Sequence, residues 1–149
     1  MLEPGATMPL LTVRDDSGAE VSTHDLLGKP LVLYFYPKDD TWGCTKEATQ
    51  FREAYEGFRK KDVELVGVSR DSVESHRAFK EKYLLPYRLL SDVDSRLCDA
   101  FGVIVEENVY GKNAIQRSTF LFDPSGTLLR VWPKVTVLGH AEDVLSAFA

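Results

Sequence analysis

Leu31-Val-Leu-Tyr-Phe-Tyr36 is the longest apolar run in the sequence. It is apolar on both faces, which is typical of a central strand covered by helices on each side. A second run of this kind spans Val63 to Val68. Between the two runs, apolar residues recur at spacings of three and four: Ala48, Phe51, Tyr55 and Phe58. This period predicts a helix with one apolar stripe against the sheet, so the three segments together predict a βαβ unit.

Two further helices are predicted in the middle of the chain. Asp71 and Glu74 have the spacing of a capping box, so a helix is expected to open at Asp71 and to stop before Pro86. The stretch from Ser95 to Gly102 predicts a short helix ended by its glycine.

The last part of the chain predicts a hairpin and a helix. Ser118 to Phe122 and Thr127 to Trp132 have strand character and are joined by the turn sequence Asp123-Pro-Ser-Gly126. Ala141 to Phe148 has an apolar side suited to a terminal helix. A parallel unit followed by a hairpin and a helix predicts an α/β protein of the thioredoxin-like fold, with a mixed central β-sheet flanked by helices.

Length and composition indicate one soluble domain. A chain of 149 residues with 44% hydrophobic and 28% charged residues suits a single domain over residues 1–149. The 18 Lys and Arg residues against 23 Asp and Glu give a net charge of -5, which disfavours nucleic acid or an anionic membrane as a partner. The N-terminus, Met1 to Gly5, lacks the basic and apolar pattern of a secretory signal, so a cytoplasmic location is expected.

The two cysteines, Cys44 and Cys98, are too few for a disulfide framework. A reducing compartment would keep them as thiols most of the time, so any function they have would depend on the reactivity of the thiol. His24, His76 and His140 stand singly and form no zinc-binding spacing with the cysteines, so no metal is expected. The three histidines are expected to face solvent or to cap helices. No phosphate loop or dinucleotide motif is present, so no cofactor is implied.

The chemistry is concentrated after the first core strand, where Pro37, Thr41 and Cys44 follow the order Pro-x3-Thr-x2-Cys. This order resembles the active site of the peroxiredoxins, and the flanking Phe-Tyr-Pro-Lys and Gly-Cys-Thr resemble the peroxiredoxin Q branch, also called bacterioferritin comigratory protein. The resemblance continues through most of the chain, including Gly111-Lys112 and Arg117 to Leu121. It implies an antioxidant thiol peroxidase that reduces hydrogen peroxide and organic hydroperoxides and is regenerated by thioredoxin or another thiol.

Three positions depart from the pattern of this branch. Trp42 stands where proline is common, which affects the expected shape of the loop. Thr49 and Lys80 stand at the two positions where members of the branch carry a resolving cysteine. The usual partners of the reactive thiol within the chain are therefore absent.

The residue types also suit peroxide chemistry, because Cys44 falls in the first turn of the predicted helix, where free amides and the dipole favour an anion. A free thiol with a pKa of about 8.5 requires roughly 3 kcal/mol of stabilisation to reach a pKa near 6. A helix end supplies about 2 kcal/mol at most, so a cation is needed.

The resemblance implies that Arg117 is this cation. Its guanidinium stays charged and offers fixed donors to a thiolate and to a departing oxygen. Thr41 is expected to exchange a proton or hydrogen bond with the peroxide, Pro37 to shield the site from water, and Glu47 to orient Arg117.

Several of these residues also fit less specific roles. Cys44 as a small buried core residue is disfavoured, because Thr-x-x-Cys beside a glycine predicts an exposed helix start. Thr41 also suits a helix cap, and Arg117 a surface ion pair. A dithiol oxidoreductase would need Cys-x-x-Cys, and Thr41 occupies the first position. A redox sensor or interaction module of the same fold, with slow turnover, remains the alternative function.

Cys98 is open to two interpretations. Leu97, Cys98 and Phe101 share one side of the short helix, which favours a small core residue, although Cys98 as the resolving thiol is possible. Since a disulfide needs alpha carbons within about 7 Å, the sequence favours a one-cysteine mechanism in a monomer or weak dimer, with a sulfenic acid at Cys44 resolved by an external thiol.

Overall fold

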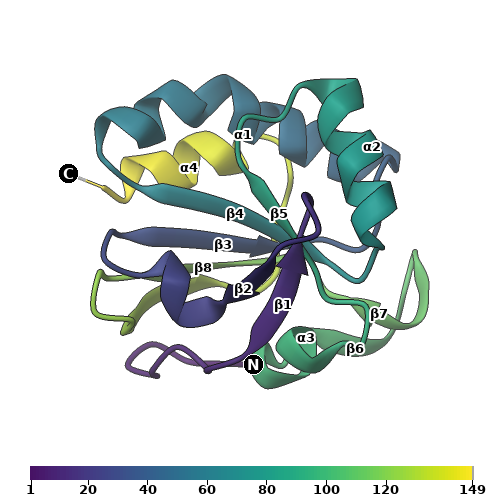
Figure 1. Cartoon of the computed structure of the whole chain (residues 1–149), viewed down its shortest axis with the longest axis horizontal. Coiled ribbons are helices and arrows are strands. Elements are labelled where there is room, and N and C mark those ends of the chain that lie inside the picture. The colour runs from purple at the N-terminus through teal and green to yellow at the C-terminus, as the bar shows by residue number, and fades with distance from the viewer. Residues whose placement is uncertain (149) are drawn as a thin grey trace.

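A seven-stranded mixed sheet runs through the centre of the computed structural model, which describes residues 1–148 (Figure 1). The strand order is β2-β1-β5-β4-β3-β8-β9, and β6 and β7 form a separate two-stranded ribbon. The strands are β1 (Thr12–Asp15), β2 (Glu20–Ser22), β3 (Leu31–Phe35), β4 (Glu64–Ser69), β5 (Arg88–Ser91), β6 (Ile104–Asn108), β7 (Gly111–Ile115), β8 (Ser118–Phe122) and β9 (Leu128–Trp132). Ala149, the last residue of the expected domain, lies outside the described residues.

The helices cover both faces of this sheet. They are the short 3-10 helix η1 (Thr23–Leu26) and the α-helices α1 (Trp42–Lys60), α2 (Val73–Tyr83), α3 (Arg96–Phe101) and α4 (His140–Ser146). In Figure 1, α1, α2 and α4 lie on one side of the sheet, and α3 and the β6–β7 ribbon lie on the other. Within residues 1–148, no helix combines the length and apolar character needed to cross a membrane.

The predicted βαβ unit is confirmed. Strands β3 and β4 are parallel, with Leu33 opposite Val66, and α1 connects them. Successive residues of β3 enter different halves of the core, as the alternation of a strand requires: Tyr34 packs under α1, and Phe35 packs against Phe101 of α3. The run is apolar on both faces because both faces are covered.

The predicted hairpin and terminal helix are also present. Strand β8 is antiparallel to both β3 and β9, so the sheet is mixed as expected. The second hairpin strand begins at Leu128 rather than Thr127, and the last helix spans His140–Ser146 rather than reaching Phe148. The short helix before Gly102 is confirmed too, with the glycine at φ 69° in the left-handed region that glycine adopts easily.

The predicted start of α2 was wrong by one residue. Ser72, not Asp71, is the N-cap, and its hydroxyl accepts a hydrogen bond from the Ser75 amide at 3.1 Å. The Asp71 carboxylate is already engaged elsewhere, because it accepts hydrogen bonds from the Asp39 amide at 2.9 Å and from the Ser69 hydroxyl. Asp71 therefore holds the loop after β3 instead of the end of its own helix.

Candidate active site

Cys44 lies in the first turn of α1, directly after the loop that leaves β3. Amides in the first turn of a helix have no carbonyl partner within the helix, so they face the region where an anion is stabilised. The side chain is nevertheless only 1% exposed, and the expectation of an exposed helix start was wrong. Cys44 packs with Tyr36, Ala48 and the other core residues under α1, while Arg117 covers its sulfur.

Arg117 reaches Cys44 from the start of β8. Because Ser118 is paired with Phe35, the last residue of β3, the residue before β8 lies beside the loop that begins α1. Arg117 Nη2 donates a hydrogen bond to Cys44 Sγ at 3.4 Å. Arg117 is 8% exposed, which does not fit the surface ion pair that the sequence left open. A permanent cation thus contacts the sulfur in a site largely closed to water.

Glu47 fixes the other side of this guanidinium. Its Oε1 accepts a hydrogen bond from Arg117 Nη1 at 2.7 Å, and the residue is 1% exposed. Burial raises the pKa of Glu47 to about 7, against the opposing effect of Arg117. Among the described residues, Oε2 has no hydrogen-bond partner, so Arg117 is the sole group that compensates this carboxyl. The contact with the Glu47 carboxylate and the contact with the Cys44 sulfur together hold the guanidinium in one orientation.

Tyr110 is a member of this cluster that the sequence analysis missed. It lies in the turn between β6 and β7, and its hydroxyl oxygen accepts a hydrogen bond from Arg117 Nη2 at 3.1 Å. The same nitrogen contacts Cys44. The one signal in the sequence was the turn-forming Gly111 directly after Tyr110. Nothing in the sequence indicated that this turn lies beside Arg117.

The loop between β3 and α1 carries the two remaining predicted residues. Thr41 occupies the N-cap position of α1 with extended backbone, but its side chain makes no capping hydrogen bond. Its hydroxyl instead donates to the carbonyl oxygen of Lys38 at 3.0 Å. Pro37 is half-buried at the start of the same loop. The structure therefore joins Cys44, Arg117 and Glu47 by direct contacts and places Pro37 and Thr41 on the adjoining loop.

The same loop is anchored through Asp39. Its Oδ1 accepts a hydrogen bond from the Tyr36 hydroxyl at 2.6 Å, and its Oδ2 accepts one from Ser75 at 2.8 Å and lies 2.7 Å from His76 Nδ1. The other ring nitrogen, Nε2, lies 2.9 Å from the Leu90 carbonyl oxygen. Both ring nitrogens therefore face oxygen atoms, an arrangement that favours the protonated imidazole, and the hydrogen bond and charge of Asp39 outweigh burial and raise the pKa of His76.

This anchor is also a group of potential metal ligands, because Asp39, Asp71 and His76 place ligand atoms within 4.8 Å of one another. In the structure these atoms bind one another: Asp39 Oδ2 lies 2.7 Å from His76 Nδ1, and Asp71 Oδ2 accepts a hydrogen bond from the Asp39 amide at 2.9 Å. These contacts tie the loop after β3 to α2.

The expected positions of two histidines were wrong. His76 is fully buried beside Asp39, and His140 is 5% exposed with Nε2 2.8 Å from the Thr119 hydroxyl. Burial lowers the pKa of His140 to about 4, so it stays neutral. His24 is exposed on η1, as expected.

Cys98 lies on the other side of the sheet from Cys44. It is fully buried on α3, packed with Leu97, Phe101 and the odd-numbered face of β3, whereas Cys44 packs under α1 with the even-numbered face. The Cys98 amide donates to Asp92 Oδ2 at 2.8 Å. Burial, followed by the charge of Asp92, raises the pKa of the Cys98 thiol far above its ordinary value. These surroundings suit an inert core residue.

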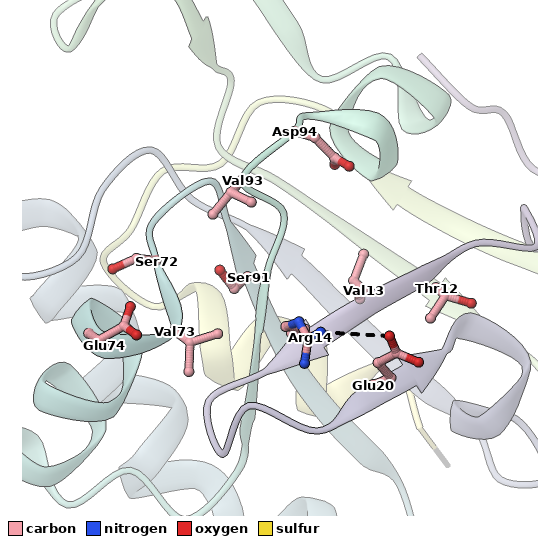
Figure 2. A pocket seen from close by; sticks show the side chains of 10 residues that line it. All are labelled: Thr12, Val13, Arg14, Glu20, Ser72, Val73, Glu74, Ser91, Val93 and Asp94. Atoms are coloured by element: carbon pink, nitrogen blue, oxygen red, sulfur yellow. Dashed lines mark ion pairs between the residues drawn. The ribbon is translucent and has the colours of Figure 1, made fainter.

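A polar hollow elsewhere on the surface is separate from this site. Figure 2 shows it beside β1 and the first turn of α2, with the Arg14–Glu20 ion pair at one wall. It is lined by Thr12, Val13, Arg14, Glu20, Ser72, Val73, Glu74, Ser91, Val93 and Asp94. None of these residues contacts Cys44 or Arg117. The chemistry is concentrated at α1.

A mixed sheet of this topology, with a cysteine in the first turn of α1 beside a buried arginine, defines a protein of the thioredoxin-fold class. The AhpC/TSA family model matches residues 4–131. The chain is 48% identical to the putative peroxiredoxin bcp of Coxiella burnetii over 97% of both chains, and 45% identical to peroxiredoxin Bcp of Bacillus subtilis over 97% of this chain and 93% of the relative.

Solved structures give the same assignment. A Cys-to-Ser variant of PrxQ from Xylella fastidiosa superposes with a TM-score of 0.93 at 37% identity, covering 99% of this chain and 95% of that one. Peroxidoxin BcpB of Mycobacterium tuberculosis superposes with a TM-score of 0.90 at 31% identity, covering 99% and 97%. The chain therefore belongs to the AhpC/TSA family, in its peroxiredoxin Q/Bcp branch, and is a thiol peroxidase. The expected thioredoxin-like fold is confirmed.

Proposed function

We propose that Cys44 is the peroxide-reducing thiol and that it acts through a sulfenic acid. The thiolate attacks one oxygen of the peroxide, the O–O bond breaks, and the sulfur keeps that oxygen as S–OH. The observation that carries this proposal is the contact of Arg117 Nη2 with Cys44 Sγ at 3.4 Å while Glu47 holds Nη1. A cation fixed in this way stabilises the thiolate and the charge that develops on the departing oxygen.

The residues of the loop after β3 have supporting roles in this proposal. The Thr41 hydroxyl proton is directed to the Lys38 carbonyl, so its oxygen presents lone pairs that accept a hydrogen bond from the bound peroxide. Pro37 offers a rigid apolar wall with no amide proton of its own. The Asp39–His76 anchor holds both residues in place.

The proposed fate of the sulfenic acid is attack by an external thiol, giving a mixed disulfide that a second thiol reduces. The position of Cys98 supports this one-cysteine route, because the sheet separates its side chain from that of Cys44. Thioredoxin or a small thiol in the cytoplasm is the proposed reductant, and the protein is proposed to act as a monomer or weak dimer. Resolution of the sulfenic acid by Cys98 is the less favoured form of the mechanism.

Intact mass after one equivalent of hydrogen peroxide tests the proposal. The wild-type protein and Cys98→Ser should both gain one oxygen and react with a sulfenic-acid trap at Cys44. Cys44→Ser should gain nothing and should consume no peroxide while remaining folded. Loss of two hydrogens, together with a Cys44–Cys98 peptide, would instead identify Cys98 as the resolving thiol. An active Cys44→Ser protein would end the proposal.

A redox sensor with slow turnover is the second candidate function, and the 1% exposure of Cys44 is the observation that favours it. Peroxide consumption with an excess of a small thiol separates the two functions. Continuous turnover is expected of the enzyme, whereas a sensor would stop after one stoichiometric oxidation.

A further inference from the structure

The Tyr110 hydroxyl is placed against the reactive centre by a ribbon that belongs to no other sheet. Strands β6 and β7 meet at Val109 and Tyr110, and the Tyr110 amide donates to Asn108 Oδ1 at 2.8 Å, which fixes the turn. Arg70 donates to the Asn113 carbonyl oxygen and ties the ribbon to the end of β4. The phenol ring remains 37% exposed, so one end of it faces solvent and the other faces Arg117.

The close approach of this phenol depends on the residue before Cys44. A Cβ atom added to Gly43 would lie 3.2 Å from Tyr110 Oη and 3.1 Å from Arg117 Nη2, which is tighter than ordinary contact. Tyr110 and Arg117 therefore both rest on the bare backbone of the first turn of α1. The phenol lies at the helix start itself, beside the sulfur that Arg117 also contacts.

The hydrogen bonds of this group leave its proton free. Arg117 is a donor, so the Tyr110 oxygen accepts in that contact. Among residues 1–148, the Tyr110 hydroxyl donates no hydrogen bond of its own. The hydroxyl of Thr41, in contrast, already donates to Lys38. The Tyr110 hydroxyl therefore contacts Arg117 through its oxygen, and its proton is available to a substrate.

We propose that Tyr110 is a catalytic residue, the general acid that protonates the departing oxygen of the peroxide; this inference rests on the proposed function of Cys44. In the step R–O–O–H plus thiolate, the sulfur bonds to the terminal oxygen, and the O–O bond breaks toward R–O. The sulfur is oxidised by two electrons to S–OH, and the peroxide is reduced. The R–O oxygen takes the Tyr110 proton and leaves as R–OH, and the phenolate then regains a proton from water.

The other groups of the site do not supply this proton. Arg117 stabilises charge but does not deprotonate in proteins. Cys44 has lost its proton before it attacks, and Glu47 is held at Nη1 of the guanidinium, whereas the sulfur and Tyr110 are at Nη2. A hydroxide or alkoxide is a poor leaving group unless a donor meets it, so a positioned acid accelerates the step.

Tyr110→Phe tests this role with a series of peroxides of different leaving groups. The variant should react about a hundredfold more slowly with hydrogen peroxide and tert-butyl hydroperoxide, which leave as hydroxide and alkoxide. With peracetic acid, which leaves as the stable acetate anion, the loss should be less than about threefold. Alkylation of Cys44 by iodoacetamide, whose iodide needs no proton, should be unchanged. Tyr55→Phe, which removes a phenol on α1 away from Arg117, is the matched control and should behave as wild type.

The outcomes separate this inference from the proposed function. A normal rate of Tyr110→Phe with hydrogen peroxide would overturn the general acid and leave the role of Cys44 untouched. An equal loss with all three peroxides, accompanied by slower alkylation, would show that Tyr110 merely positions Arg117 and would also overturn it. Peroxide reduction by Cys44→Ser would instead remove the proposed function itself.

Discussion

Asp39 and His76 form an ion pair that is closed to solvent on both sides, with Asp39 Oδ2 2.7 Å from His76 Nδ1 and side-chain exposures of 4% and 0%. The pair joins the loop that carries Thr41 to α2, and the Leu90 carbonyl oxygen extends the link to β5. Burial alone would lower the pKa of His76, but the hydrogen bond and charge of Asp39 raise it above its ordinary value of 6.5. The charged pair is therefore the state that holds the loop.

Replacing one partner of this pair should destabilise the protein more than replacing both. His76→Gln leaves the Asp39 carboxylate buried without a counter-charge, which is expected to cost about 3–5 kcal/mol of unfolding free energy. Asp39→Asn with His76→Gln should recover part of that loss, because no charge remains. Urea unfolding at pH 6 measures both, since a raised His pKa gives stability that is full below about 6.5 and lost as the pH rises through the folded pKa. Simple additivity of the two substitutions would contradict the ion pair.

Arg117→Ala should slow the reaction with hydrogen peroxide by about a hundredfold, because it removes a fixed donor from the developing charge. Alkylation of Cys44 by iodoacetamide should also slow, because the sulfur loses its hydrogen-bond donor. Arg117→Lys restores a positive charge, but an ammonium group cannot contact Glu47 and Cys44 as the guanidinium does. It should therefore recover part of the rate of Cys44 alkylation and little of the rate of peroxide reduction. Stopped-flow kinetics and the rate of alkylation give both values. Unchanged rates for Arg117→Ala would remove it from the site.

Glu47→Gln should change how stability depends on pH. The folded pKa of Glu47 is about 7 and its ordinary value is 4.5, so the folded state holds the proton more tightly and the unfolding free energy falls as the pH rises from 4.5 to 7. The full effect is up to about 3 kcal/mol. The difference in stability between pH 5 and pH 8 should thus be smaller in Glu47→Gln than in wild type. Equal differences would show that the carboxyl does not titrate in this range.

Gly43→Ala should separate stability from activity. Alanine favours a helix over glycine by up to about 1 kcal/mol, which offsets part of the cost of displacing the buried Arg117, so the melting temperature should change by less than about 5 °C. The added methyl group would push Arg117 and Tyr110 away from the helix start, and kcat/KM for hydrogen peroxide should fall about tenfold or more. Gly57→Ala, the other glycine-to-alanine change in α1, is unsuitable as a control for helix propensity, because its methyl group would lie 2.6 Å from the Leu145 side chain. A fully active Gly43→Ala protein would contradict the close approach.

The parts of the fold that the sequence predicted are those with strong periodicity. Two-sided apolar runs identified β3 and β4, and the stripe of α1 was readable because helix and strand periods differ. The N-terminal hairpin and β5 were not predicted, because their strands have only three or four residues. The β6–β7 ribbon was not predicted because it is largely polar, with Ile104 and Ile115 paired at one end and Asn108 and Gly111 at the other.

The unpredicted parts of the site come from tertiary contacts. Arg117 and Glu47 were expected near Cys44, and their contacts are in the structure, but the burial of Cys44 depends on what packs over it. Tyr110 comes from a ribbon that the sequence analysis did not predict. His76 is separated from Asp39 by 37 positions, and no local pattern reveals a partner at that distance.

The seven-stranded sheet between Cys44 and Cys98 has a kinetic consequence. A resolving thiol on the same chain meets its target at an effective concentration of about millimolar, whatever the surrounding solution contains. A thiol delivered by another molecule makes recovery second order, so its rate follows the supply of that molecule. The oxidised form should therefore accumulate whenever peroxide arrives faster than reductant, and the fraction oxidised would report the ratio of the two.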